Sequence, residues 1–239
     1  MSEISPTSED GLSGILKQIA AKLCSLDPVP ASLLRYCIDD LLPIIKSVVN
    51  LSFNSASMPC SMKNAVLSPL LNNPSLDFEI FSNFRPLSNL KFLSKVIEKV
   101  AAMRLTDYLC DNDLKESLQY AYKKHHSCET APLRVQNDIL KSIDNKQCVV
   151  LLLLDLSAAF DTNHKILLHR LRFRFGTKEK ALAWLQSYLT DRSQSVQIDG
   201  FTSSVRPLRF GIPQGSVLGP LLYLLFPGLK VVLSISLTG

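Results

Sequence analysis

An apolar run of six residues, Val149 to Leu154, most strongly constrains how this chain can fold, and it ends at Asp155. Six residues are too few to cross a membrane, but they suit a β-strand that is buried on both faces of a sheet. A carboxylate at the end of such a strand has to be paired, hydrogen-bonded or metal-bound, because an isolated charge is costly at low dielectric constant. The run therefore predicts a covered sheet that delivers one acidic side chain to its edge.

Asp155 has two possible roles on this pattern. Its carboxylate can cap the helix that follows the strand by accepting hydrogen bonds from backbone N–H groups. Alternatively, it can face a ligand or a metal ion, because the small residues Ala158 and Ala159 and the aromatic Phe160 follow it and leave room beside the backbone. A second acid, Asp161, stands six residues further on. The spacing alone leaves both roles open.

The composition fits a globular chain with a large core. The 239 residues are 46% hydrophobic and 20% charged, which argues against disordered, collagen-like and coiled-coil folds. The sequence has no repeat at the period of about 20 to 50 residues that solenoids and propellers require. The six cysteines form no Cys-x-x-Cys pair and no secretory signal pattern precedes them, so we expect reduced thiols. Pro220, Pro227, Gly228 and Lys230 interrupt the apolar stretch 217–237, so we expect no membrane span.

Hydrophobic periodicity predicts a helix-rich α+β fold. Apolar residues at helical spacing predict helices over residues 12–26, 89–110, 129–143 and 178–190, and a helical region over 31–53 that breaks or kinks at Pro43. Residues 54–90 are rich in Ser, Asn and Pro and are expected to form loops and short strands. Asp199-Gly200 joins two strand-like runs and predicts a tight hairpin.

Basic residues gather in two places although the formal net charge is only +5. Residues 164–180 hold six Lys and Arg against one acid, and the polar side of the helix expected over 89–110 carries Lys91, Lys95, Lys99 and Arg104. Such runs are typical of a solvated face, and they are also typical of a surface that contacts nucleic-acid phosphates. The sequence leaves these two alternatives open.

Two further motifs combine conformationally special residues with polar ones. Gly211-Ile212-Pro213-Gln214-Gly215 has glycines on both sides of Gln214, which permit a close approach of the backbone, and an apolar helix can begin near Ser216. Asn83-Phe84-Arg85-Pro86 places an arginine before a proline, where a guanidinium can meet a phosphate with two parallel hydrogen bonds. Each motif alone is also compatible with an ordinary loop or a surface salt bridge.

Taken in order, these motifs resemble the reverse transcriptase domain of non-LTR, LINE-type retrotransposons of the jockey-like group. The resemblance runs from about Asp27 to Phe226 and rests on the segments DPVPASLL, NFRPLSNLKFLSKVIEKV, HSCETA, VVLLLLDLSAAFDT, ALAWLQSYLTDRSQSVQI and GIPQGSVLGPLLYLL. It implies the fingers and part of the palm of a right-hand polymerase. It divides the chain into an N-terminal helical extension (1–26), a fingers-like region (27–146), a partial palm (147–226) and a divergent tail (227–239).

The resemblance also implies roles for individual residues. Asp155 would bind catalytic Mg²⁺ together with the backbone carbonyl of Leu156, and Phe160 would pack under the nucleotide sugar. Arg85 would touch the triphosphate, and Gln214 and Gly215 would line the nucleotide and template pocket. The implied partners are an RNA template, a DNA primer and a deoxynucleoside triphosphate, with no membrane.

The sequence departs from the family in ways that put activity in doubt. The family's other two metal-binding carboxylates belong to a Tyr-Ala-Asp-Asp hairpin downstream of the Pro-Gln-Gly motif, and the 239 residues contain no such motif. Asn72-Asn73 stands where relatives carry two lysines, and Ala121 to His125 replaces a Gly-Phe-Arg-Pro-Gly core. We therefore expect a truncated palm that is inactive alone. The alternatives are an RNA or RNA–DNA binding remnant and a decayed element without a selected function.

Overall fold

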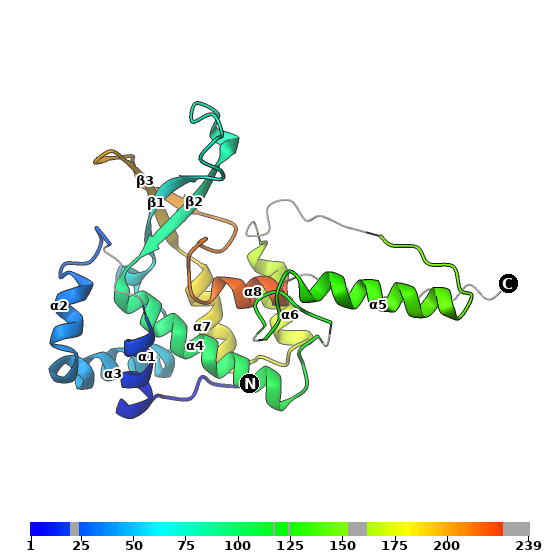
Figure 1. Cartoon of the computed structure of the whole chain (residues 1–239). Coiled ribbons are helices and arrows are strands. Elements are labelled where there is room, and N and C mark those ends of the chain that lie inside the picture. Colours follow the sequence, from blue (N-terminus) through cyan, green and yellow to red (C-terminus); the bar gives the residue numbers. More distant parts are fainter. Residues whose placement is uncertain (20–23, 117, 124, 153–161, 227–239) are drawn as a thin grey trace.

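Helix α4 (Phe92–Asp111) lies at the centre of the molecule, and the other helices of the body and the sheet are arranged around it (Figure 1). The computed structural model describes residues 1–19, 24–116, 118–123, 125–152 and 162–226. Nine α4 side chains are buried, including Val96, Ile97 and Val100. The predicted helix over 89–110 is therefore confirmed, and its apolar residues form the middle of the core.

Three helices precede the sheet: α1 (Glu9–Gln18), α2 (Ala31–Tyr36) and α3 (Ile38–Asn54). The expected helix over 12–26 ends earlier, at Gln18, and residues 20–23 lie outside the described residues. The second helical region is broken at Cys37, not at Pro43, which stands inside α3. Pro43 is the sixth residue of α3, so its missing N–H removes one hydrogen bond near the beginning of the helix, where such a loss is tolerated best.

Five strands form a mixed sheet: β1 (Asn64–Leu71), β2 (Phe84–Leu90), β3 (Arg192–Ile198), β4 (Phe201–Thr202) and β5 (Arg206–Leu208). Strand β1 pairs antiparallel with β2 and parallel with β3, and both β4 and β5 pair antiparallel with β3. The expected short strands within residues 54–90 are thus confirmed as β1 and β2. The sheet connects the segment around Arg85 with the second half of the chain.

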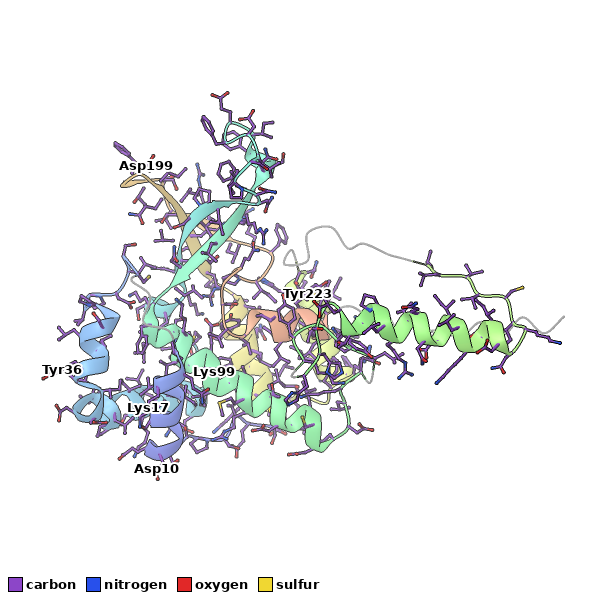
Figure 2. All side chains as sticks on the ribbon, viewed as in Figure 1. Asp10, Lys17, Tyr36, Lys99, Asp199 and Tyr223 are labelled. Atoms are coloured by element: carbon purple, nitrogen blue, oxygen red, sulfur yellow. The ribbon has the colours of Figure 1, made fainter. Side chains whose placement is uncertain are left out.

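The predicted hairpin at Asp199-Gly200 is present. Ile198 pairs with Phe201 across a two-residue turn, and both turn residues have positive φ, 49° at Asp199 and 84° at Gly200. That geometry matches the twist of the flanking strands and suits Asp-Gly. Figure 2 shows Asp199 at the tip of this hairpin, away from the helices.

The second half of the chain supplies α6 (His164–Phe173), α7 (Glu179–Leu189) and α8 (Gly219–Leu225). Trp184 of α7 is fully buried, donates a hydrogen bond from Nε1 to Ser52 Oγ at 2.9 Å and meets the Phe53 ring edge-on at a centroid distance of 5.4 Å. The helix expected over 178–190 is therefore confirmed. Its tryptophan fastens α7 to α3.

Helix α5 (Thr130–Asp144) projects away from this body (Figure 1) and has no buried residue. The prediction of a helix over 129–143 is confirmed. The prediction of a buried strand beginning at Val149 is wrong for residues 149–152, which form no strand and leave Val150 77% and Leu152 75% exposed. A doubly buried strand needs a paired strand on at least one side, and within the described residues none pairs with this segment.

Two further expectations concern the cysteines and membrane-spanning helices. All six cysteines are free thiols, as the absence of Cys-x-x-Cys pairs predicts. Among the helices of the described residues, none combines the length and the hydropathy that crossing a bilayer would require.

Candidate functional site

The loop 211–218, here called the Gln214 loop, lies directly on strand β2. Ser88 donates its backbone N–H to the carbonyl oxygen of Gln214 at 2.7 Å. Gly215 has φ +111°, and a Cβ atom there would lie 2.9 Å from the Ser88 carbonyl oxygen and 3.3 Å from Leu87 Cδ1. A residue with a side chain would be strained in this conformation and would collide with the β2 backbone. Glycine at position 215 is what allows the loop to touch the strand.

Arg85 lies on the same face of β2 as the contact with Gly215. Side chains two residues apart on a strand share a face, so Arg85 and Leu87 are neighbours on the exposed side, whereas Ser88 and Leu90 are buried on the other. Arg85 is exposed and donates from Nε to Asn72 Oδ1 at 2.7 Å and from Nη2 to the Asn72 carbonyl at 3.4 Å. Gln214 and Gly215 thus contact β2 at Ser88 and Leu87, and Arg85 lies on the same strand three residues before Ser88.

The other three predicted site residues are Asp155, Leu156 and Phe160, and they lie outside the described residues. Thr162 is the next described residue, and its carbonyl oxygen accepts a hydrogen bond from Gly211 N at 2.8 Å. His164 Nε2 lies 2.6 Å from the Gly211 carbonyl oxygen. The described segment that begins two residues after Phe160 is therefore hydrogen-bonded to Gly211, the first residue of the Gln214 loop.

An open depression of about 520 Å³ adjoins this loop. It is lined from the beginning of α6, from β3 and from the segment that leads into the loop, by Asn163, Gln194, Pro207, Leu208, Arg209 and Phe210. Arg209 is exposed and gives this depression a positive charge. The last lining residue of the depression, Phe210, directly precedes Gly211, the first residue of the Gln214 loop.

Sequence reasoning missed Glu98, which holds the far end of the same loop. Its Oε2 accepts hydrogen bonds from the backbone N–H groups of Val217 at 2.8 Å and Leu218 at 3.2 Å, and its Oε1 accepts from Ser94 Oγ at 3.2 Å. The signal was present in the sequence: Glu98 stands seven and eleven residues before Leu105 and Leu109, which is the spacing of one helix face.

Burial raises the pKa of Glu98, and the positive charge of Arg192 and the hydrogen bonds from Leu218, Val217 and Ser94 offset only part of this effect. Burial likewise raises the pKa of Asp27, both of whose carboxylate oxygens lie 3.1 Å from the Phe92 N–H at the beginning of α4. Each of the two carboxylates therefore accepts hydrogen bonds from backbone N–H groups at the beginning of a helix, α4 for Asp27 and α8 for Glu98, and each loses hydration on burial.

Some bases of the two basic regions already form hydrogen bonds or ion pairs within the chain. Within the run 164–180, Arg170 donates to the Phe226 carbonyl and Arg174 pairs with Glu116. On α4, Arg104 donates to the carbonyl oxygens of Ser5 and Pro6 at 3.3 and 3.1 Å. Four bases of the run keep exposed side chains: Lys165, Arg172, Lys178 and Lys180. These four, together with the half-buried Lys91 directly before α4 and Lys95 and Lys99 within it, are the candidates for contacts with phosphates.

No metal centre is formed by the described residues, in which no group of three or more His, Cys, Asp or Glu side chains lies close enough to hold an ion. His125, His126 and Cys128 are therefore not part of such a group. Asp155 and Leu156 were not included in that search. The Mg²⁺ prediction stays a prediction.

The geometry at Gly215 gives a direct test of the loop contact. We expect Gly215→Ala to lower the free energy of unfolding by about 1–3 kcal/mol through backbone strain, with a further loss from the contact with Ser88. Gly200→Ala is the matched control, because Gly200 also has positive φ but a Cβ there would meet no atom within 4 Å. Urea denaturation of both variants measures the difference, and equal losses would contradict the close approach of the loop to β2.

The comparisons with known proteins identify the family of the chain. The sequence profile of the family described as reverse transcriptase (RNA-dependent DNA polymerase) matches residues 72–227. A probable RNA-directed DNA polymerase from transposon BS of Drosophila melanogaster is 33% identical over 158 residues, which are 66% of this chain and 17% of the relative. The RNA-directed DNA polymerase from mobile element jockey of the same fly is 29% identical over 197 residues, which are 81% of this chain and 21% of the relative.

The chain spans about a fifth of the length of the curated relatives it matches. The matched region contains the Arg85 strand, helix α4 and the Gln214 loop. On the profile match and the similarity to these relatives, the chain belongs to the reverse transcriptase family and carries a reverse transcriptase domain of the non-LTR retrotransposon type.

Proposed function

We propose that this chain forms the fingers and part of the palm of an RNA-directed DNA polymerase. The observation that carries the proposal is the contact of the Gln214 loop with β2, which places Gln214 and Gly215 against Ser88, three residues along the strand from Arg85. In this proposal the chain divides into an N-terminal helical extension (1–26), a fingers-like region (27–146), a partial palm (147–226) and a tail (227–239). The partners are an RNA template, a DNA primer and a deoxynucleoside triphosphate.

Arg85 is proposed to contact the triphosphate. Its two hydrogen bonds to Asn72 use two of the five N–H donors of a guanidinium, which leaves three donors for phosphate oxygens. These bonds also fix the direction of a long side chain and so lower the entropy that binding would cost. Asn72 itself carries no charge, so Arg85 provides the positive charge at this end of β2.

The metal part of the site is incomplete in this chain. Two Mg²⁺ ions at the usual separation of about 3.5–4 Å activate the primer hydroxyl and hold the triphosphate in polymerases. Asp155 and the Leu156 carbonyl would supply one carboxylate and one neutral oxygen, and the 239 residues contain no Tyr-Ala-Asp-Asp motif to add two more. One carboxylate cannot offset the charge of two divalent ions. The donor set therefore does not fit the complete two-ion site, and we propose that the chain alone does not polymerise DNA.

A second candidate function is the binding of RNA or of an RNA–DNA duplex without chemistry. Exposed side chains of Lys165, Arg172, Lys178 and Lys180 favour it, since such a cluster contacts phosphates without regard to sequence. This function needs neither Asp155 nor a metal ion.

Primer extension tests the proposed incomplete metal site, and filter binding tests the second candidate function. With an RNA template, a DNA primer, Mg²⁺ and deoxynucleoside triphosphates, we expect no extension by the purified chain. Filter binding of the same RNA–DNA hybrid should show an affinity that falls steeply as salt rises and that is unchanged in Asp155→Asn. Extension that Asp155→Asn abolishes would contradict the proposed incomplete site.

Arg85 provides the test of nucleotide contact. We expect Arg85→Ala to weaken binding of a deoxynucleoside triphosphate about fivefold, which corresponds to about 1 kcal/mol, because charge-assisted hydrogen bonds to phosphate are lost. Equilibrium dialysis with a radiolabelled nucleotide measures the affinity. Arg134→Ala is the control, since Arg134 is also exposed and bonded to a polar side chain, Asp138, but lies on α5. Equal effects of the two variants would remove Arg85 from the proposed site.

A further inference from the structure

Glu98 is an acidic residue in the middle of the hydrophobic core. Its side chain is fully buried on α4, between the apolar residues that pack that helix against its neighbours. Acidic side chains are seldom fully buried unless several hydrogen bonds compensate for their desolvation. Three donors supply this compensation, and two of them are the backbone N–H groups of Val217 and Leu218. Two of these three hydrogen bonds to Glu98 therefore come from the Gln214 loop.

A second buried charge, that of Arg192, acts on this carboxyl group. Arg192, 2% exposed at the beginning of β3, donates from Nη1 to the Tyr188 carbonyl oxygen at 2.9 Å, and its guanidinium lies 4.8 Å from the centre of the Tyr188 ring. Its positive charge acts on Glu98. The pair is contributed by α4 and β3, so these two elements and the loop meet at one buried polar cluster, consisting of Glu98, Arg192, Tyr188 and Ser94.

The Gln214 loop is held in its middle and near its C-terminal end by elements that follow one another in the chain. At Gln214 it is bonded to Ser88 of β2, and at Val217 it is bonded to Glu98 of α4, which begins directly after β2 and Lys91. Gly215 lies between these two attachments. The distance from the loop to the exposed face of β2 is therefore set jointly by the β2 backbone and by the reach of the Glu98 side chain.

Val217 and Leu218 have no intrahelical acceptor for their N–H groups, because they stand at the beginning of α8. Ser216 Oγ accepts from the next N–H, that of Gly219, at 3.0 Å. Glu98 and Ser216 together satisfy three successive donors. Without the carboxyl oxygen, two buried N–H groups would lose their acceptor, and the loop would have to move to recover one.

We propose that Glu98 is a positioning residue for the Gln214 loop, which it fixes against β2 so that Gln214 and Gly215 face an RNA–DNA hybrid and an incoming nucleotide. The role rests on the proposed function, since it is the reverse transcriptase pocket that the loop would line. Glu98 touches neither ligand and acts through the amides of Val217 and Leu218. The feature that matters is an acceptor oxygen at the right reach, not the negative charge.

Variants at position 98 separate reach, acceptor and charge. Glu98→Gln keeps the length and one acceptor oxygen, Glu98→Asp keeps the charge but shortens the side chain by one methylene, and Glu98→Leu removes the acceptor. Glu98→Gln and Glu98→Leu both leave Arg192 buried without its opposite charge, and Glu98→Leu in addition leaves two amides without their acceptor, so Glu98→Leu can fail to fold. Glu98→Asp then carries the test. Asp27→Asn is the matched control, a carboxylate that accepts from the α4 N-terminus away from the loop.

The readouts are the affinity for a fluorescent RNA–DNA hybrid of about 20 base pairs, the melting temperature, and hydrogen exchange at residues 211–218. We expect Glu98→Leu and Glu98→Asp to weaken hybrid binding about tenfold and to speed exchange at Val217 and Leu218. Glu98→Gln should stay within about threefold of the unaltered chain, and Asp27→Asn should lower the melting temperature without changing hybrid affinity.

Unchanged affinity and exchange in Glu98→Asp would overturn the inference, as would a loss in Glu98→Gln as large as in Glu98→Asp. If the unaltered chain binds no hybrid, the proposed function fails and exchange alone decides the positioning role. Faster exchange of the loop in Glu98→Asp than in Glu98→Gln would then support it, and equal exchange would overturn it.

Discussion

The carboxyl group of Glu98 joins the helical core to the loop that carries the candidate site. It lies in the core of α4, where removing a charge from water costs several kcal/mol after relaxation, and it recovers that cost through hydrogen bonds from Val217, Leu218 and Ser94 and through the charge of Arg192. An apolar residue would pack in this place without the desolvation cost. What it could not do is accept hydrogen bonds from the two amides that begin α8.

This arrangement places rigid elements on both sides of a short loop. Strand β2 is paired with β1 over seven positions, and α4 is packed on several sides by core residues. The Gln214 loop spans from one to the other, and glycine at position 215 lets it approach the strand more closely than any residue with a side chain could. The site residues that lie on β2 and on the loop are therefore held by the core and not by the loop alone.

Much of this fold could be predicted from local patterns. The helix around Val96 and Val100, the helix containing Trp184 and the turn at Asp199-Gly200 follow from spacing and turn chemistry, which are local properties of the sequence. The break at Cys37 and the exposed segment 149–152 could not be predicted, because tertiary packing decides whether an apolar run pairs as a strand. The same holds for Arg170 and Arg174, whose partners Phe226 and Glu116 are distant in sequence.

At the candidate site, sequence patterns predicted Arg85, Gln214 and Gly215; the structure places Gln214 and Gly215 against Ser88 of β2 and Arg85 three residues earlier on the same strand, and the predicted roles of all three stay predictions. Asp155, Leu156 and Phe160 lie outside the described residues, so their predicted roles stay predictions. Glu98 was missed because an acidic residue in an amphipathic helix is usually exposed. Its position on the apolar face becomes clear only when its spacing from Leu105 and Leu109 is compared with the helical repeat. The family relationship explains the order of the motifs, and the contacts of this chain explain how they are held.

The hydrogen bonds of Glu98 to the loop can be measured directly by following the amide signals of Val217 and Leu218 in ¹H–¹⁵N NMR spectra across pH. Since burial raises the pKa of Glu98 above its ordinary value of 4.5, both amide signals should shift together with a midpoint above that value. The shift should disappear in Glu98→Gln. Burial raises the pKa of Tyr188, so the Tyr188 hydroxyl does not titrate in the acidic range. Amide signals that are independent of pH in the unaltered chain would contradict the account.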